Sequence, residues 1–255
     1  DNNASPQTQV LKSEVAMNYG PVNKEIISAN ILGYLEGSDL KDELVVFSAH
    51  YDHIGLTTDG GIDKVNNGAD DDGSGTTGVL TIARAYAKAK EAGHGPRRSI
   101  LFLLVTGEEK GLLGSEYYSL NPIFPMANTI TNLNIDMIGR IGEAYKDSPD
   151  AANYCYLIGS DKLSTDLHKI SENANAVYTK MKIDYKFNDP KDPERIYYRS
   201  DHYNFAKNGI PIVFYFNGVH EDYHKASDEV SKIKKNKGRI KGGNCYVGSF
   251  RRNSI

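Results

Sequence analysis

The sequence predicts a single α/β domain built on a mixed, mainly parallel β-sheet sandwiched between helices. Apolar runs of strand length alternate along the chain with segments of helical periodicity, which is the pattern of parallel sheets with crossover helices. The 255 residues suffice for one large domain and are too few for two of ordinary size. A hydrophobic content of 39% and a charged content of 25% are typical of globular proteins.

The first two strands are expected as a pair. Residues 26–36 are rich in β formers and end at Gly37-Ser38-Asp39, a turn signal, and the apolar run 43–47 follows at once. We interpret the two segments as a β-hairpin whose second strand delivers His50 and Asp52 to its carboxyl end, where open α/β sheets hold their sites. Later strands are expected at 99–105, 129–135, 154–158 and 210–216, with an edge-like extended segment at 180–187.

The first helix is expected over residues 76–92, where apolar residues recur with helical spacing. Ser74 and Asp72, which are residue types that cap helix N-termini, stand just before it, and Gly93 stops it. Further helices are expected from residue 111 and over residues 163–176, and a short one ends at Lys207 and is capped by Ser200 or Asp201.

The two ends of the chain differ from its middle. Residues 1–24 are polar and weakly patterned, residues 25–233 carry the expected elements, and residues 234–255 form a basic tail that we expect to be disordered. From residue 232 onward there are eight basic and no acidic side chains, which leaves 22 basic against 33 acidic side chains in the rest. This acidic body argues against nucleic acid as the main partner. No apolar run is long enough for a transmembrane segment.

Three adjacent carboxylates, Asp70 to Asp72, stand just before the first long helix. Like charges at that spacing repel one another, and a bound cation is the usual reason for a fold to accept them. Solvated loop carboxylates with a helix cap are the simpler alternative. A calcium loop is a third interpretation, because Asp70-x-Asp72-x-Ser74 opens like an EF-hand, but its twelfth position is Thr81 where a glutamate is required.

Carboxylates also follow two other expected core strands, as Glu108 with Glu109 and as Asp136. Taken singly, these acids have ordinary explanations as surface residues or strand-terminating caps. His53 and His224, taken singly, are interpreted as surface histidines. Only the combination of the acids with histidines at strand ends indicates a particular chemistry.

Five imidazole and carboxylate side chains are expected at strand ends or adjoining loops: His50, Asp71, Glu109, Asp136 and His224. Such ligands suit zinc, with manganese or cobalt as alternatives, and water-bearing sites of this kind carry out hydrolysis. Five ligands are too many for one catalytic zinc. The set suits two zinc ions that share a bridging ligand.

Five motifs resemble those of the two-zinc exopeptidases, the family that includes secreted bacterial leucyl aminopeptidases, glutamate carboxypeptidase and glutaminyl cyclase. The motifs run in order through the chain: Ser48-Ala49-His50-Tyr51-Asp52, Gly68-Ala69-Asp70-Asp71-Asp72-Gly73-Ser74-Gly75, Gly107-Glu108-Glu109-x-Gly111-Leu112-x-Gly114-Ser115, Asn134-x-Asp136-Met137-Ile138-Gly139 and Tyr223-His224-x-x-Ser227-Asp228. The similarity extends from about residue 30 to residue 233. It implies a zinc exopeptidase-like fold for the expected domain at 25–233.

The resemblance also implies how two zinc ions would be held. It assigns His50 and Asp136 to one ion and Glu109 and His224 to the other, with Asp71 bridging both. It implies a cis peptide bond directly after the bridging aspartate.

Two acids that hold no metal have expected catalytic roles. Asp52 stands two residues after His50 and is placed to accept the second ring N–H of that histidine, which fixes the tautomer. Glu108 is free to take a proton from the attacking water and to pass it to the departing amine.

Three residues are candidates for contact with the substrate. Tyr223 is the first candidate and Tyr197 the second for a donor that stabilises the oxyanion. Asp201 is a further candidate, although a helix cap is its simplest interpretation. The free α-amine of a substrate would sit against carboxylates and metal, which explains why sites of this kind trim amino ends.

The expected activity is removal of N-terminal amino acids from peptides with a free N-terminus. Glutaminyl cyclase is one alternative, but that enzyme works with one zinc and lines its pocket with tryptophan, and this chain has no tryptophan. A carboxypeptidase acting on acidic dipeptides is another, because Arg195 and Arg199 could supply a basic pocket. A non-catalytic receptor-like relative is the third. The resemblance implies a secreted, periplasmic or cell-envelope location after removal of a leader.

Overall fold

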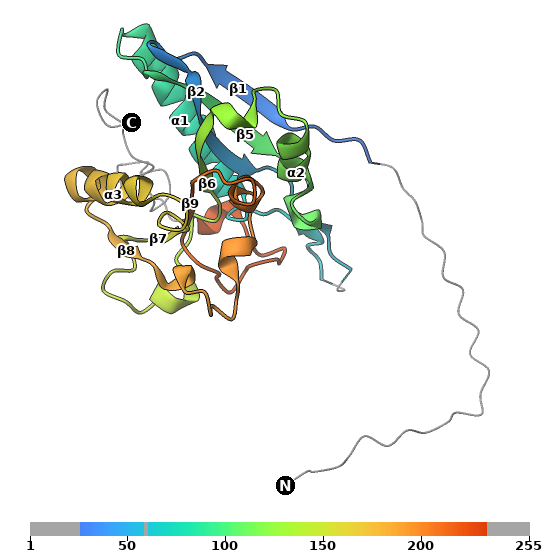
Figure 1. Ribbon diagram of the computed structural model, residues 1–255. Coiled ribbons are helices and arrows are strands. Elements are labelled where there is room, and N and C mark those ends of the chain that lie inside the picture. Colours follow the sequence, from blue (N-terminus) through green and yellow to red (C-terminus); the bar gives the residue numbers. More distant parts are fainter. Residues whose placement is uncertain (1–25, 59–60, 234–255) are drawn as a thin grey trace, which may run out of the picture.

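The computed structural model describes residues 26–58 and 61–233 (Figure 1). The expected polar segment at 1–24 and the basic tail at 234–255 lie outside the described residues, and both stay predictions. A seven-stranded sheet in the order β1-β5-β2-β6-β9-β7-β8 forms the centre, and β3 and β4 form a separate ribbon. The strands are β1 (Ile31–Leu35), β2 (Leu40–His50), β3 (Gly55–Leu56), β4 (Val65–Asn66), β5 (Arg98–Val105), β6 (Thr129–Ile135), β7 (Tyr154–Ile158), β8 (Lys182–Asp184) and β9 (Ile212–Phe216).

The four central strands β5, β2, β6 and β9 are parallel to one another. Strand β1 is antiparallel to β5, and β7 is antiparallel to β9 and carries β8 in parallel beyond it. The expectation of a mixed, mainly parallel sheet is therefore confirmed. The extended segment expected near residue 180 is β8, and it lies at the edge of the sheet as expected.

The expected hairpin between the first two strands was wrong. Strand β1 pairs with β5, with Gly33 opposite Phe102, so β5 lies between β1 and β2. Strand β2 is buried from Leu44 to its end and needs neighbours on both sides. The equally buried β5 supplies one of them, and the more exposed β1 is left to cover the edge of the sheet.

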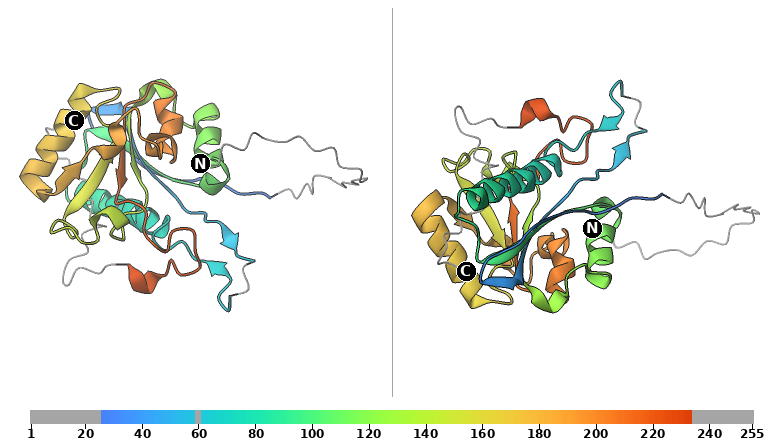
Figure 2. Two further views of the ribbon diagram at one scale, coloured as in Figure 1. Left: turned by 90° about the horizontal axis from the view of Figure 1, so that it is seen from below. Right: turned by 90° about the horizontal axis from the view of Figure 1, so that it is seen from above.

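Helices cover both faces of the sheet, and Figure 2 shows α1 on one side and α4 on the other. The helices are α1 (Gly73–Glu91), α2 (Leu113–Leu120), α3 (Thr165–Ala174) and α4 (His202–Ala206). Val79 of α1 and Leu167 of α3 pack on the face that carries Phe47. Tyr118 of α2 and Phe205 of α4 pack on the opposite face. This apolar layering is the sandwich that the periodicity predicted.

The helix starts show how well local sequence signals work. Helix α1 begins at Gly73, and its N-cap Asp72 accepts a hydrogen bond from the Gly75 backbone N–H, as the capping signal indicated. The expectation that Ser200 or Asp201 caps the short helix was wrong for the side chain, because Asp201 stands at the N-cap of α4 without a side-chain cap bond. The Ser200 hydroxyl instead donates to Asp136, and Asp201 accepts from the hydroxyl of Ser115 in α2.

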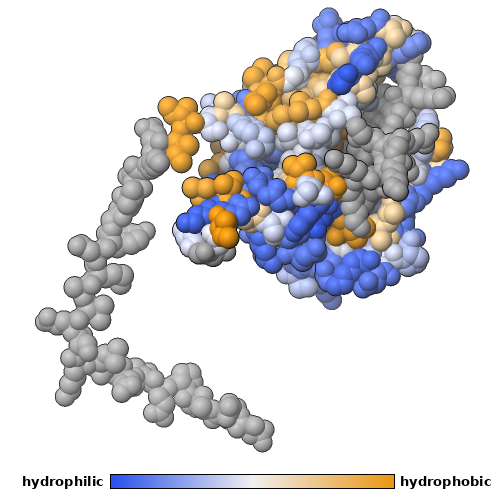
Figure 3. Space-filling view, turned by 180° about the vertical axis from the view of Figure 1, so that it is seen from behind, coloured by the Kyte–Doolittle hydropathy of each residue, from blue (hydrophilic) through white to orange (hydrophobic). Residues whose placement is uncertain are grey.

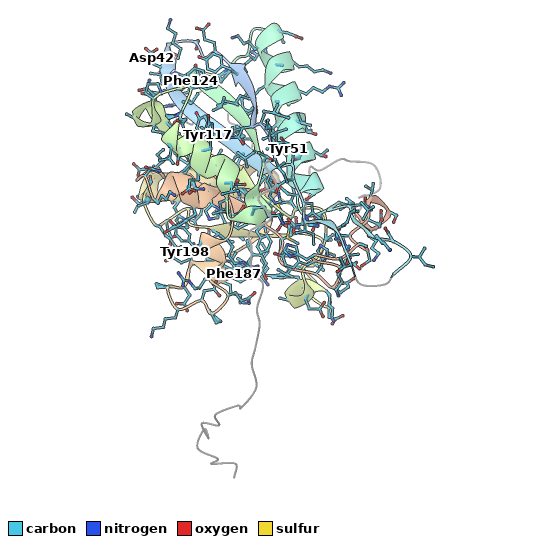
Figure 4. All side chains as sticks on the ribbon, turned by 90° about the vertical axis from the view of Figure 1, so that its right-hand side faces the viewer. Asp42, Tyr51, Tyr117, Phe124, Phe187 and Tyr198 are labelled. Atoms are coloured by element: carbon cyan, nitrogen blue, oxygen red, sulfur yellow. The ribbon has the colours of Figure 1, made fainter. Side chains whose placement is uncertain are left out.

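The topology places the end of β2 at a switch point. The chain passes from β2 to β5 on one side and later to β6 on the other, so a crevice opens at the carboxyl end of β2. His50 is the last residue of that strand, and Tyr51, labelled in Figure 4, follows it. The face seen in Figure 3 is largely hydrophilic with separate apolar patches. Within the described ranges, no helix is long and apolar enough to cross a membrane.

Candidate functional site

Three ligand-type side chains converge at the carboxyl edge of the sheet. The Nε2 atom of His50 lies 3.2 Å from Oδ1 of Asp71 and 3.8 Å from Oδ2 of Asp136. One ligand atom from each of these residues falls within 4.8 Å of the others, and all three residues are buried. The group could hold one metal ion.

A second group forms on the other side of the same aspartate. The Nε2 atom of His224 lies 3.2 Å from Oδ2 of Asp71 and 3.2 Å from Oε2 of Glu109. His53 approaches the same two acids, with its Nδ1 atom 2.8 Å from Oε1 of Glu109 and 3.9 Å from Oδ2 of Asp71. Asp71 thus presents one oxygen to each group, which is how a carboxylate bridges two ions.

Only one of the three adjacent acids faces this site, and Asp72 has a structural role instead. Its Oδ2 atom accepts from the backbone N–H of His50, and its Oδ1 atom accepts from the N–H groups of Gly75 and Met137. Asp72 therefore ties the end of β2, the start of α1 and the residue after Asp136 together. Asp72 is therefore a helix cap, and Asp71 is the acid of this run whose position suits a bound cation.

Hydrogen bonds to Asp228 and Gly139 hold the loop that carries Asp71. The Oδ2 atom of Asp228 accepts from the backbone N–H groups of Asp70 and Asp71 at 3.0 and 3.2 Å. The Oδ1 atom of Asp70 accepts from the N–H of Gly139, and its Oδ2 atom lies 3.2 Å from Nε2 of the buried His220. The peptide bond after Asp71 is cis, as the resemblance implied.

A buried polar chain runs across the sheet to Asp136. The side chain of Asn132 donates to Ser48, and Ser48 donates to Asn134. Asn134 in turn donates to the Ser200 hydroxyl, which donates to Oδ2 of Asp136 at 2.7 Å. The Oδ1 atom of Asp136 is left without a hydrogen-bond partner in the described part of the chain. Ser200 therefore orients one carboxylate oxygen and leaves the other for a ligand.

Asp52 differs from its expected role in the atom that contacts His50. The Nδ1 atom of His50 lies 3.0 Å from the backbone carbonyl of Asp52 and 3.6 Å from its carboxylate. The carboxylate accepts from the backbone N–H groups of Glu108 and Glu109 at 3.1 and 3.4 Å. Asp52 thus fixes the turn that carries both glutamates as well as standing beside the histidine.

Glu108 faces the first group without being part of it. Its Oε2 atom lies 4.0 Å from Nε2 of His50, and its side chain is about nine-tenths buried. Burial, together with the charges of Asp136 and Asp201, raises the pKa of Glu108 to about 10. A carboxyl group with a raised pKa in a pocket is a candidate acid or base.

The remaining titratable groups form a tightly paired set. The carboxylates of Asp71 and Glu109 raise the pKa of His224 to about 9. Burial lowers the pKa of His50, but the carboxylates of Asp52 and Asp71 outweigh it and hold that pKa well above its usual value. Burial raises the pKa of Asp136 to about 7. Without a bound cation, protons on these groups balance the crowded acids.

The donor set fits divalent metal ions. Within residues 26–58 and 61–233, several buried atoms that face the two groups have no hydrogen-bond partner: Nε2 of His50, Nδ1 and Nε2 of His53, Oε1 of Glu109 and Oδ1 of Asp136. Buried polar atoms are normally satisfied, so a cluster of orphans indicates a missing partner. Imidazole nitrogens and carboxylate oxygens in this number are ligands of zinc.

A pocket opens beside the two groups. Four acids line it, Asp71, Glu108, Glu109 and Asp136, and Arg199 and Tyr223 also line the space. Five apolar side chains complete the lining: Met137, Ile196, Phe214, Phe216 and Val219. The Nη2 group of Arg199 donates to the Tyr223 hydroxyl at 3.3 Å.

Of the three candidates for substrate contact, the structure brings only Tyr223 to this pocket. Tyr197 packs against apolar clusters, and its backbone carbonyl lies 2.8 Å from Nε2 of His202. Asp201 is fully buried and accepts from the Ser115 hydroxyl at 2.5 Å. Neither lines the pocket. Asp201 is buried because α4 packs against α2. The residues around Asp201 give no local signal of that contact.

Sequence reasoning missed His53, which it treated as a surface histidine. Its side chain is only 8% exposed and points at Glu109. The available signal was its position three residues after His50, on a chain that has already reached the site. Arg199, considered for a different function, was missed as a partner of Tyr223.

Comparison with known proteins places the chain among peptidases. The model of peptidase family M28 matches residues 30–244. Leucine aminopeptidase 2 of Trichophyton rubrum is 27% identical over 254 residues, covering 90% of this chain and 45% of that protein. A probable zinc metalloprotease of Pyrenophora tritici-repentis is 35% identical over 115 residues, covering 44% of this chain and 22% of that protein.

A solved structure has the same fold. The zinc aminopeptidase BSAP from Bacillus subtilis superposes with a TM-score of 0.60 at 24% identity, covering 80% of this chain and 45% of that chain. This chain therefore spans less than half the length of these relatives.

Proposed function

The chain belongs to peptidase family M28, and on that premise we propose that it is a two-zinc aminopeptidase that removes N-terminal amino acids from peptides. The observation that carries the proposal is the position of Asp71 between two groups of ligand atoms, with one oxygen toward His50 and the other toward His224 and Glu109. A carboxylate with both oxygens committed in this way suits two ions and exceeds what one needs.

In this proposal His50 and Asp136 would hold one zinc, Glu109 and His224 would hold the other, and Asp71 would be a ligand of both. Manganese or cobalt could replace zinc, since both accept the same ligands. Bound cations would lower the pKa of the attacking water, polarise the scissile carbonyl and favour the ionised form of nearby acids.

Glu108 is the proton carrier. Its carboxylate accepts a proton from the attacking water and donates it to the departing amine nitrogen, so one group serves as base and then as acid. Asp52 supports this role by binding the backbone N–H of Glu108, which fixes the start of the turn. The charge of the buried Asp201 raises the pKa of Glu108, which favours the protonated form of Glu108 after the first step.

Tyr223 and the apolar residues of the pocket orient the substrate. Burial and the nearby acids raise the pKa of Tyr223, so its hydroxyl keeps its proton and can donate a hydrogen bond to the carbonyl oxygen as negative charge develops there. The substrate's α-amine, a cation, pairs with the acids of the pocket. Its first side chain contacts the apolar residues of the pocket, which favours substrates with an apolar N-terminal residue.

The test combines metal analysis with a substrate panel. The purified protein is expected to bind two zinc ions and to release p-nitroaniline from amino-acid p-nitroanilides, fastest from those with apolar side chains. N-acetylated versions are the matched controls and should not react, because they lack the α-amine. Cyclisation of N-terminal glutamine without hydrolysis would favour a cyclase, and two bound ions without turnover would favour a receptor-like role.

Zinc uptake by the metal-free protein is expected to strengthen as pH rises. His224, with its pKa raised to about 9, is protonated at neutral pH and must lose that proton before it can bind a metal. Each displaced proton costs about tenfold in apparent affinity for every pH unit below the pKa. Competition with a chromophoric chelator between about pH 6 and pH 8 measures the slope. An affinity that stays constant over this range would contradict the assignment of His224.

The proposal also covers the cellular location of the protein and the bounds of its catalytic domain. We place the protein outside the cytoplasm, in a secreted, periplasmic or cell-envelope setting, and we place the catalytic domain at 25–233 between a polar segment and a basic tail. Cell fractionation and limited proteolysis test the two statements.

A further inference from the structure

His53 lies against the second group of ligand atoms, close to both Glu109 and Asp71. Its Nδ1 atom lies 2.8 Å from Oε1 of Glu109, while His224 lies 3.2 Å from Oε2 of the same carboxylate. The two imidazole rings stand edge to face, with centroids 5.7 Å apart. Each oxygen of Glu109 is thus approached by one imidazole, and Asp71 lies within 3.9 Å of both.

The 2.8 Å contact between His53 and Glu109 lacks the alignment of a well-formed hydrogen bond. Within the described ranges, neither ring nitrogen of His53 has a hydrogen-bond partner, and Oε1 of Glu109 has none either. A well-aligned ring N–H at 2.8 Å would satisfy both atoms, and the ring does not have that alignment. Two buried acceptor-type atoms that face a common point without bonding to each other are the arrangement that a cation completes.

The fold makes room for this imidazole. Gly68 has a φ of +61°, and a Cβ atom at that position would lie 2.6 Å from Cγ of His53 and 2.3 Å from the backbone carbonyl of Asp71. A side chain at Gly68 would therefore displace the ring. Asp63 supports the same loop by accepting from the backbone N–H of Val65 at 3.1 Å.

We propose that His53 is a third imidazole ligand of the two-zinc site and binds, through Nδ1, the ion that Glu109 and His224 hold. The inference rests on the proposed function, since it needs the second ion. Ligand atoms about 2.0 to 2.1 Å from a tetrahedral zinc lie roughly 3.3 Å apart, and the spacings among His53, Glu109, His224 and Asp71 scatter about that value.

The consequence is an unequal pair of sites. The ion beside His50 would have one imidazole ligand, whereas the other would have two, from His53, whose side chain is 8% exposed, and from His224, whose side chain is 36% exposed. The second site should therefore bind zinc more tightly than the first. It should still bind zinc, with lower affinity, when His224 alone is replaced.

The first experiment uses the wild-type holoprotein loaded with NMR-active cadmium. Coupling between cadmium and ring protons identifies each histidine that binds an ion directly. Coupling to His50, His53 and His224 is the expected result, and coupling to only His50 and His224 would overturn the inference. A protein that binds no cadmium or zinc at all would instead refute the proposed function.

The second experiment compares zinc affinities by chelator competition in His53→Ala, His53→Gln and His224→Ala. Both His53 variants should weaken one of the two sites by more than the 10- to 100-fold that loss of an outer-shell partner causes. Gln can still donate an amide hydrogen to Glu109, so normal affinity in His53→Gln would show that His53 only orients that carboxylate. His53→Ala combined with His224→Ala should abolish the second site.

His94→Gln is the matched control. His94 is exposed and follows α1, whose 19 residues span about 28 Å from the site. Its zinc affinities should equal those of the wild type.

Discussion

Replacing Glu108 with glutamine is expected to lower kcat by about 10²- to 10⁴-fold, the usual contribution of a general acid or base. The amide has the shape of the carboxyl group but cannot take a proton from water. Because Glu108 is assigned no metal, both zinc ions should stay bound, and KM for an apolar amino-acid p-nitroanilide should change little. Steady-state kinetics and metal analysis on the same preparation measure the three quantities together.

The stability of the metal-free Glu108→Gln variant provides a further check. Burial raises the pKa of Glu108 to about 10, so this carboxyl group is protonated at neutral pH when no cation is bound. Glutamine resembles the protonated acid, and the midpoint of metal-free unfolding should therefore hardly move.

Glu116→Gln is the control for a change of charge alone. Glu116 forms a half-exposed pair with Lys207 at 3.3 Å, and such surface pairs contribute little. Unchanged kcat in Glu108→Gln with both ions present would remove Glu108 from the mechanism.

The sequence predicted the strands well because buried strands are rich in apolar residues. The run 100–105 is an unbroken apolar segment, and a chain segment that is buried on both sides can be little else than a central strand. The run 129–135 mixes apolar residues with threonine and asparagine, yet it is buried almost throughout. Pairing is a different problem. Nothing local indicates that β5 rather than β2 is the neighbour of β1, because that choice depends on a contact between residues about 70 positions apart, such as Gly33 and Phe102.

The site was predictable to the same degree and for the same reason. Residues at the ends of parallel strands meet at one edge, so His50, Glu109 and Asp136 could be brought together without a structure. His53 and Asp201 were misjudged because loops and helix packing decide their positions. His53 turns inward only because Gly68 leaves space, and Asp201 is buried beneath α2 through Ser115.

Asp71→Asn is expected to have the largest effect of any single substitution in the site, because Asp71 is the residue shared by both ligand groups. An amide offers one neutral oxygen in place of two anionic ones, so affinity should fall at both positions and activity should be lost with the metal. Zinc that binds only the folded protein stabilises it by about 2.7 kcal/mol per ion at a free concentration of 100 Kd. Thermal unfolding with and without zinc should show that this stabilisation is lost in Asp71→Asn.

The adjacent Asp70→Asn variant separates this effect from simple damage to the loop. Asp70 is equally buried, but its carboxylate binds the Gly139 N–H and faces His220 instead of the two ligand groups. Asp70→Asn should lower the free energy of unfolding by a similar amount with and without zinc and should keep the zinc-dependent gain. Asp71→Asn should lose the gain itself. If Asp71→Asn still binds two ions with wild-type affinity, the carboxylate between the two groups is not a bridge, and the two-ion site proposed for this chain is wrong.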